Sequence, residues 1–223
     1  MKKFRDKEGL FVVEGEKTIN EIVRDHRELI DCIVTTSESY SFDGKLYHTD
    51  EHSMKQISSF KTVPNILAVV RKPRFEEDLS GLTIALDDIQ DPGNLGTIIR
   101  TADWFGVKTI LCNQHTVDVF NPKVIQSTMG AIFRVNIIYC DLQEKLKTLN
   151  KTKYAAIMNG SDLYHEKLNQ DGIIIIGNEG NGVSQEISDL ADVGLTIPKF
   201  GESESLNAAM ACGILLSHFR SQL

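Results

Sequence analysis

The chain has 223 residues, with 41% hydrophobic and 25% charged side chains, the composition of an ordinary globular protein. Its longest apolar runs are too short to cross a bilayer, and its charged N-terminus lacks the apolar core of a signal peptide. The net charge of −7 excludes a protein that is basic over its whole surface. We therefore expect a cytoplasmic protein with no membrane partner.

The charge is unevenly distributed along the chain. Residues 1–75 carry a net charge of +1, and residues 76–223 carry −8. Phosphate contacts supply most of the affinity for nucleic acid, so such a partner requires a local basic patch, and the N-terminal part is the better candidate. From charge alone, a solvated and frayed terminus explains Lys2, Lys3, Arg5 and Lys7 equally well.

The cysteines give no sign of a metal site. Cys32, Cys112, Cys140 and Cys212 are widely spaced in apolar surroundings, and no C-x-x-C pair is present. We expect buried thiols and neither a zinc site nor a disulfide framework.

The first 74 residues predict a small α/β domain. Apolar residues at helical spacing from Ile19 to Ile30 predict an amphipathic helix. Short strands are expected at residues 32–35, 46–49 and 66–70, with a second helix near residues 51–58. Pro73 and the acidic residues 76–78 then favour a linker.

The rest of the chain, residues 79–223, predicts a second domain in which strands alternate with helices. This alternation indicates a mostly parallel sheet with helices on both faces, whose ligands bind beyond the carboxyl ends of the strands. The expected strands are residues 82–86, 109–112, 135–138, 154–158, 173–176 and 195–197. The expected helices carry Leu95 to Ala102, residues 123–128, 142–149, 183–187 and the segment from Leu206 onward.

Glycine-rich and small polar segments follow these strands. Gly177-Asn178-Glu179-Gly180-Asn181-Gly182 follows an apolar run, and its glycines would admit a ligand close to the backbone, although such loops are often only tight turns. The loop is neither G-x-G-x-x-G nor a P-loop, which argues against NAD and ATP. Ile197-Pro198 ends another strand, and Ser205-Leu206-Asn207 opens the last helix, where capping and core packing are the alternative explanations.

A third polar segment contains Asn94 and Arg100. Asn94 is a natural helix cap, and an exposed helix arginine would be the ordinary explanation for Arg100. Asp87-Asp88-x-x-Asp91 has the spacing of a magnesium motif found on helices of all-α enzymes. The preceding strand and Pro92 argue against that motif, and we expect no metal.

The order and spacing of these segments resemble the SpoU (TrmH-like) family of the SPOUT superfamily, RNA ribose 2′-O-methyltransferases that use S-adenosyl-L-methionine. The resemblance runs from about Phe11 to the C-terminus and includes residues 11–17 and 127–134. It implies an L30e-like RNA substrate-binding domain over residues 1–74. It also implies a methyltransferase domain with a C-terminal trefoil knot over residues 79–223, a homodimer, and a ribosomal or transfer RNA substrate rather than DNA.

The resemblance also implies the site residues. The catalytic set is Asn94, Arg100, Glu179, Ser205 and Asn207. The cofactor set is Met158, Asn159, Gly160, Gly177, Asn178, Glu179, Gly180, Gly182, Ile197, Pro198, Ser205, Leu206 and Asn207.

Several points stay open at this stage. Family members often assign Arg100 the role of base, yet a guanidinium is almost always protonated, so gripping a phosphate and stabilising an alkoxide is the alternative. The main alternative function is a non-enzymatic RNA-binding protein with the same fold. A dehydrogenase lacks its glycine fingerprint. We expect Gly177→Val to abolish cofactor binding without unfolding the protein, and residues from Glu76 onward to fold alone.

Overall fold

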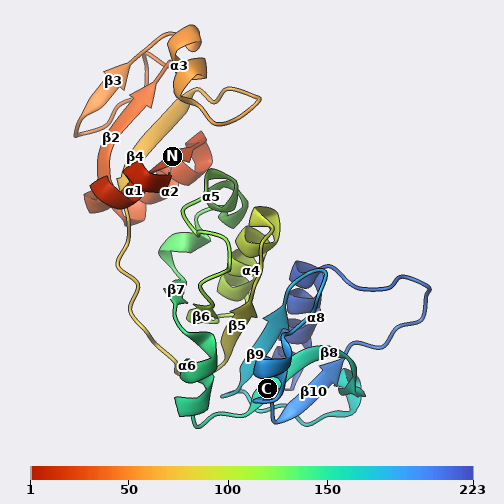
Figure 1. Ribbon diagram of the computed structural model, residues 1–223. Coiled ribbons are helices and arrows are strands. Elements are labelled where there is room, and N and C mark those ends of the chain that lie inside the picture. The colour runs from red at the N-terminus through yellow and green to blue at the C-terminus, as the bar shows by residue number, and fades with distance from the viewer. Residues whose placement is uncertain (1, 223) are drawn as a thin grey trace.

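The computed structural model describes residues 2–222 and contains two sheets (Figure 1). The N-terminal sheet has the strand order β1-β4-β2-β3. Strands β1 and β2 run antiparallel to β4, and β3 runs parallel to β2. The elements of this part are α1 (Lys2–Glu8), β1 (Leu10–Glu14), α2 (Glu16–Asp25), η1 (Arg27–Leu29), β2 (Ile30–Thr35), β3 (Leu46–His48), α3 (Glu51–Ile57) and β4 (Ile66–Arg71).

Two sequence-based expectations for this part are wrong. The helix predicted through Ile30 ends at Asp25, because His26 leaves helical geometry with φ −143° and ψ 35°. Ile30 instead begins β2. The basic N-terminus is not frayed at Arg5, which lies in α1 and pairs with Asp118 at 2.7 Å, the two side chains being only 17% and 18% exposed.

The second sheet is the parallel sheet that the sequence predicts. Its strand order is β10-β8-β9-β5-β6-β7, and every pair is parallel. Its strands are β5 (Thr83–Asp87), β6 (Thr109–Cys112), β7 (Asn136–Tyr139), β8 (Lys153–Asp162), β9 (Ile173–Gly177) and β10 (Val193–Thr196). Its helices are α4 (Pro92–Trp104), α5 (Pro122–Thr128), η2 (Ala131–Phe133), α6 (Leu142–Thr148), η3 (Leu163–His165), α7 (Gln185–Ser188) and α8 (Ala208–Ser221).

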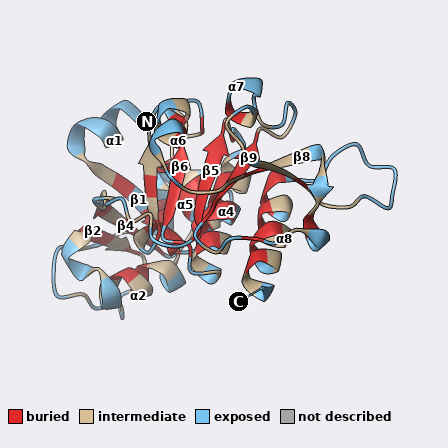
Figure 2. Ribbon diagram, turned by 90° about the horizontal axis from the view of Figure 1, so that it is seen from below, coloured by how far each residue is buried: buried red, intermediate tan, exposed pale blue. Residues whose placement is uncertain are grey.

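Helices cover both faces of this sheet. One core cluster joins the central strands to α4 and α8, and a second joins their opposite faces to α6 and α7. Every residue of β5 and β9 is buried, as the red central strands in Figure 2 show. Burial on both sides explains why these strands are continuous apolar runs. None of the helices among residues 2–222 is long and apolar enough to cross a membrane.

The two sheets share one hydrophobic core. Phe11 of β1 lies 5.1 Å from Phe120 and 6.1 Å from Phe133 between ring centroids. The same cluster contains core residues of both parts of the chain. The connecting segment is also held down, because the Asp78 backbone N–H donates to the Thr109 hydroxyl at 3.2 Å. The expected linker is therefore ordered along the second domain.

Helix α4 packs closely against two neighbours that matter for the site. A Cβ on Gly96 would overlap Ser127 of α5 and lie 2.8 Å from the carbonyl of Val124, so only glycine allows this approach. On its other side α4 contacts α8. The trefoil knot implied for the C-terminal segment stays a prediction.

Candidate active site

The polar segments singled out in the sequence gather at the carboxyl end of the parallel sheet. Strands β5 and β9 are neighbours, and Asp87 is paired with Gly177 at the end of the ladder. The loops that follow these two strands therefore start side by side. Such a strand end is where ligands bind in open α/β sheets.

Asn94 joins three segments that are far apart in the sequence. Its Nδ2 donates to Oε1 of Glu179 at 2.8 Å, and its Oδ1 accepts from Nδ2 of Asn207 at 2.9 Å. Asn207 also caps α8, because its Oδ1 accepts from the backbone N–H groups of Ala209 and Met210. The structure thus brings together three of the five expected catalytic residues through one hydrogen-bonded chain.

The glycine loop is closed by Asn178. Its backbone N–H and C=O form a pair of 2.9 Å hydrogen bonds with Gly182. The Oδ1 of Asn178 accepts from the N–H groups of Gly180 and Asn181, and its Nδ2 donates to the carbonyl of Asp88 at 2.9 Å. One amide side chain therefore sets the shape of the whole loop and ties it to the end of β5.

The reason for glycine at position 177 differs from the expected one. A Cβ there would overlap the backbone of Gly182 and Val183, within the loop itself. Gly182 has φ +72°, a conformation that side chains rarely adopt. We now expect Gly177→Val to disrupt the loop, with a lower melting temperature, so loss of cofactor binding in this variant would not locate the ligand.

Asp87 holds the loop from below, a role that the sequence does not reveal. The carboxylate is almost fully buried; Oδ1 accepts from Nδ2 of Asn113 and Oδ2 from the backbone N–H of Ser184, both at 2.8 Å. Asn113 follows β6, and Ser184 begins α7. Asp87 therefore connects the ends of three strands. The pairing of Asp with Asn and a loop N–H is visible only once the fold is known.

The acidic triplet does not form a metal site. Asp91 caps α4 by accepting from the N–H of Asn94 at 2.9 Å and lies 3.5 Å from Lys123. Asp88 has φ +64° and accepts from Gln90. Within residues 2–222 no group of three His, Cys, Asp or Glu side chains has a metal-binding arrangement.

Met158, Asn159 and Gly160 lie in a bulge of β8 rather than after its end. One residue step in β10, from Gly194 to Leu195, corresponds to the step from Ala155 to Ser161 in β8. The hydroxyl of Thr196 fixes the bulge by accepting from the N–H of Gly160 at 2.6 Å and donating to the carbonyl of Ile157 at 2.9 Å. The expected strand at residues 154–158 is thus longer, and its irregular part faces β10.

The segment between β10 and α8 is the most open part of the site. Ile197 and Pro198 are half-buried, whereas Ser205 and Leu206 are exposed and Phe200 is 96% exposed. Among the described residues, Ser205 takes part in no hydrogen bond. The structure does not bring this expected catalytic residue to Asn94.

Arg100 is also apart from the Asn94 network. It lies six residues further along α4, about 9 Å along the axis and about 120° around it. Its guanidinium is exposed and makes no hydrogen bond or ion pair within residues 2–222. It shares an exposed stripe of the helix with Thr97 and with Trp104, which is 84% exposed.

The cysteines are free thiols, as expected, although only Cys112 and Cys212 are fully buried. Burial raises the pKa of Cys112, and raises that of Cys212 to about 12. Cys32 and Cys140 are half-buried, and burial raises their pKa values as well. The four thiols are therefore protonated near neutral pH and poor nucleophiles.

Comparison with known proteins agrees with this architecture. The model of the SpoU rRNA methylase family matches residues 81–217, and the model of the MRM3-like substrate binding domain matches residues 1–68. The chain belongs to the SpoU rRNA methylase family.

Particular relatives cover nearly the whole chain. The 23S rRNA (guanosine(2553)-2′-O)-methyltransferase RlmP of Bacillus subtilis is 30% identical and covers 98% of this chain and 92% of its own length. A solved TrmH-family protein from Porphyromonas gingivalis is 36% identical, with a TM-score of 0.88 over 100% of this chain and 94% of its own. The AdoMet-bound rRNA methyltransferase of Sinorhizobium meliloti is 26% identical, with a TM-score of 0.87 over 100% of this chain and 91% of its own.

Proposed function

We propose that this protein transfers a methyl group from S-adenosyl-L-methionine to a ribose 2′-hydroxyl in structured RNA, and that 23S ribosomal RNA is the first substrate to test. The observation that carries the proposal is the hydrogen-bonded chain of Glu179, Asn94 and Asn207 at the carboxyl end of the sheet. The Bacillus subtilis relative, an rRNA 2′-O-methyltransferase that matches nearly the whole chain, supports it.

The residues around this chain suit the cofactor. Adenine needs apolar cover and backbone hydrogen-bond partners, and the methionine part needs polar groups. Met158 and Leu206 are exposed apolar side chains in two of the expected cofactor segments. The loop of residues 177–182 and the segment of residues 197–207 supply the backbone and polar groups. These segments would hold the cofactor.

The chain's own groups would orient the reacting hydroxyl. When bound, the cofactor supplies a methyl group on a positively charged sulfur, together with a good leaving group. Oε2 of Glu179 has no hydrogen-bond partner among the described residues, so it is available to accept from the ribose 2′-hydroxyl. Asn94 holds Oε1 of the same carboxylate, which fixes its direction. Positioning of this kind is a major part of catalysis in a displacement reaction.

Arg100 would act on the RNA rather than on the cofactor. A guanidinium binds phosphate with two N–H groups and keeps its positive charge, which suits a backbone phosphate and the negative charge that develops on the 2′-oxygen. Its position on the outer stripe of α4 separates it from Asn94 of the same chain. Arg100 would therefore complete the active site of a second copy.

A homodimer would bury this outer stripe. Trp104, Met210 of α8 and Leu206 are large, exposed apolar side chains on or beside the paired helices α4 and α8. Exposed apolar side chains gathered on adjoining elements are typical of an interface, and a two-fold contact would use the same face of both copies. Light scattering tests this: we expect a dimer at micromolar concentration and a monomer for Trp104→Glu. A wild-type monomer with full activity would contradict it.

The enzymatic activity is tested with methyl-labelled S-adenosyl-L-methionine and unmodified transcripts of 23S ribosomal RNA and of transfer RNA. We expect label in RNA, resistant to alkaline cleavage at the modified nucleotide because the 2′-oxygen is blocked. Glu179→Gln serves as the matched variant, with slower transfer expected. RNA binding without any transfer to either RNA would instead favour the non-enzymatic RNA-binding protein.

A further inference from the structure

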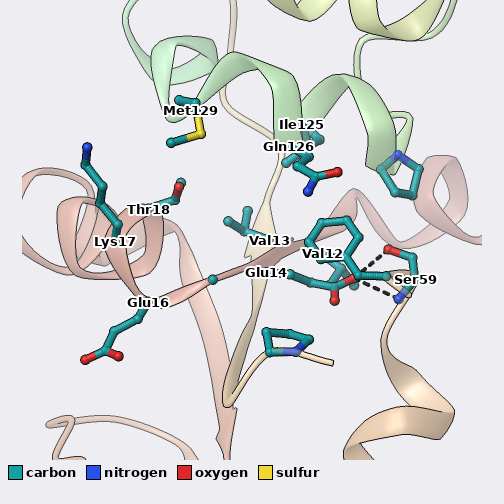
Figure 3. Close-up of a pocket in the computed structure, with 14 residues that line it drawn as sticks. Val12, Val13, Glu14, Glu16, Lys17, Thr18, Ser59, Ile125, Gln126 and Met129 are labelled. Atoms are coloured by element: carbon teal, nitrogen blue, oxygen red, sulfur yellow. Dashed lines mark hydrogen bonds between the residues drawn. The ribbon is translucent and has the colours of Figure 1, made fainter. Parts of the chain in front are cut away.

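A groove of about 270 Å³ lies between the two parts of the chain (Figure 3). One wall is formed by β1, the start of α2 and the segment between α3 and β4, and the other by α5. Both family-like stretches without an assigned role, residues 11–17 and 127–134, contribute to it or to the contact beside it. The residues of interest are Val12, Lys17, Phe60, Pro64, Gln126 and Met129.

The groove has rigid sides. Arg134 donates to Glu21 of α2 and, through Nε and Nη2, to Asp103 of α4 at 2.8–3.1 Å. A Cβ on Gly130, which has φ +90°, would lie 3.1 Å from the Glu21 carboxylate. The two parts of the chain are thus pinned together beside the groove.

The free charge at the groove is positive, although two acids line it. The carboxylate of Glu14 accepts from the hydroxyls of Ser58 and Ser59 at 2.5 Å and from the N–H of Ser59 at 2.9 Å. Glu16 accepts from Asn65 at 3.3 Å. Lys17, in contrast, is exposed and has no acceptor among the described residues. An anion at the rim would therefore meet an unpaired ammonium group.

The groove is physically connected to the reaction centre. Its α5 wall packs without space on α4 at Gly96. At the start of α5, Lys123 pairs with Asp91, the residue that caps α4 and binds the N–H of Asn94. Helix α5 has seven residues and is therefore about 10 Å long. One RNA chain could cover both places.

We propose that this groove is an RNA subsite that receives one unpaired nucleotide near the methylated one. The base would lie against the apolar faces of Phe60, Pro64 and Met129, and its phosphate would face Lys17. Proteins recognise single-stranded nucleotides by this combination of stacking and positive charge. The inference rests on the proposed function and adds a place where the substrate is selected.

Two variants of the full chain test the subsite. Gln126→Trp fills the groove from an exposed position on α5, and Lys17→Glu reverses the charge at its rim. The matched controls are Gln56→Trp and Lys55→Glu, both exposed on α3, which does not line the groove. Filter binding of an unmodified 23S ribosomal RNA transcript is measured without cofactor, together with KM for that RNA, kcat and melting temperature.

We expect about tenfold weaker RNA binding and a correspondingly higher KM for the two groove variants, with kcat and melting temperature unchanged. The α3 controls should bind like the wild type. If the groove variants bind the transcript as tightly as the wild type, the subsite is wrong, even when the wild type methylates that RNA. If the controls lose as much affinity as the groove variants, the effect is one of general charge and bulk, which also overturns the subsite. Because binding is measured separately from methyl transfer, failure of the proposed activity is seen independently.

Discussion

Removal of the Asp87 carboxylate tests whether this buried acid shapes the cofactor loop. In Asp87→Ala the Nδ2 of Asn113 and the N–H of Ser184 lose acceptors that now lie at 2.8 Å. Asp87 is only 5% exposed, so its replacement also leaves an unfilled space at the end of β5. The loop of residues 177–182 would lose its attachment to the strand beneath it.

The size of the effect follows from the two hydrogen bonds. A hydrogen bond to a charged group contributes about 1.5–3 kcal/mol, so the pair has an upper limit of about 6 kcal/mol. Ser184 is exposed, and water can replace the acceptor for its N–H. We therefore expect a loss of about 2–4 kcal/mol in the free energy of unfolding. Asp87→Asn keeps one carbonyl oxygen and should lose about half as much.

Urea unfolding and calorimetric titration with S-adenosyl-L-methionine measure the two consequences. Affinity for the cofactor should fall by about tenfold or more, because part of the binding free energy is then spent on ordering the loop. Asp189→Ala is the control, since Asp189 is an exposed acid next to α7 that accepts only from Gln185 in this region. An Asp87→Ala protein with wild-type stability and cofactor affinity would refute the reasoning.

Three further predictions concern other parts of the molecule. Arg100→Ala should keep cofactor affinity by calorimetry but lose most methyl transfer to RNA, because the side chain acts on the RNA; near wild-type turnover would show that its role is wrong. Phe11→Ala should cost about 3–5 kcal/mol in urea unfolding. For the same reason residues 76–223 alone should show poor solubility; a stable, well-folded fragment would contradict the shared core. Lys108 and Ser80 lower the pKa of the Asp78 carboxyl. Its contribution to stability is therefore complete above about pH 4 and is lost as pH falls through the lower folded value. The melting temperature should fall in acid less steeply for Asp78→Asn than for the wild type.

The sequence predicts the second domain better than the first. Strands such as residues 173–176 are buried on both sides, so they appear as continuous apolar runs that need no knowledge of the fold. The helix predicted through Ile30 fails because the apolar spacing continues past His26, where the backbone turns. The edge strand β1 was not expected, since nothing in residues 10–14 distinguishes a strand from the approach to a helix.

The site is only partly visible in the sequence. Asn94, Glu179 and Asn207 carry motif positions, and the structure joins them. The role of Asp87 depends on Asn113 and Ser184, which are distant in sequence and meet it only because β5, β6 and β9 are adjacent. The bulge in β8 depends on Thr196 of another strand, and no local pattern announces it.

The shared core between the two parts of the chain bears on how recognition domains can be exchanged. Phe11 inserts toward Phe120 and Phe133, and Glu21 meets Arg134 across the same contact. A recognition domain grafted from another family member would have to present an aromatic side chain and an acid at these two places. Grafts that ignore them would leave a buried aromatic face open to water. New RNA targets in this family should therefore be reached more readily by changes at the outer surface of the small domain than by replacing it.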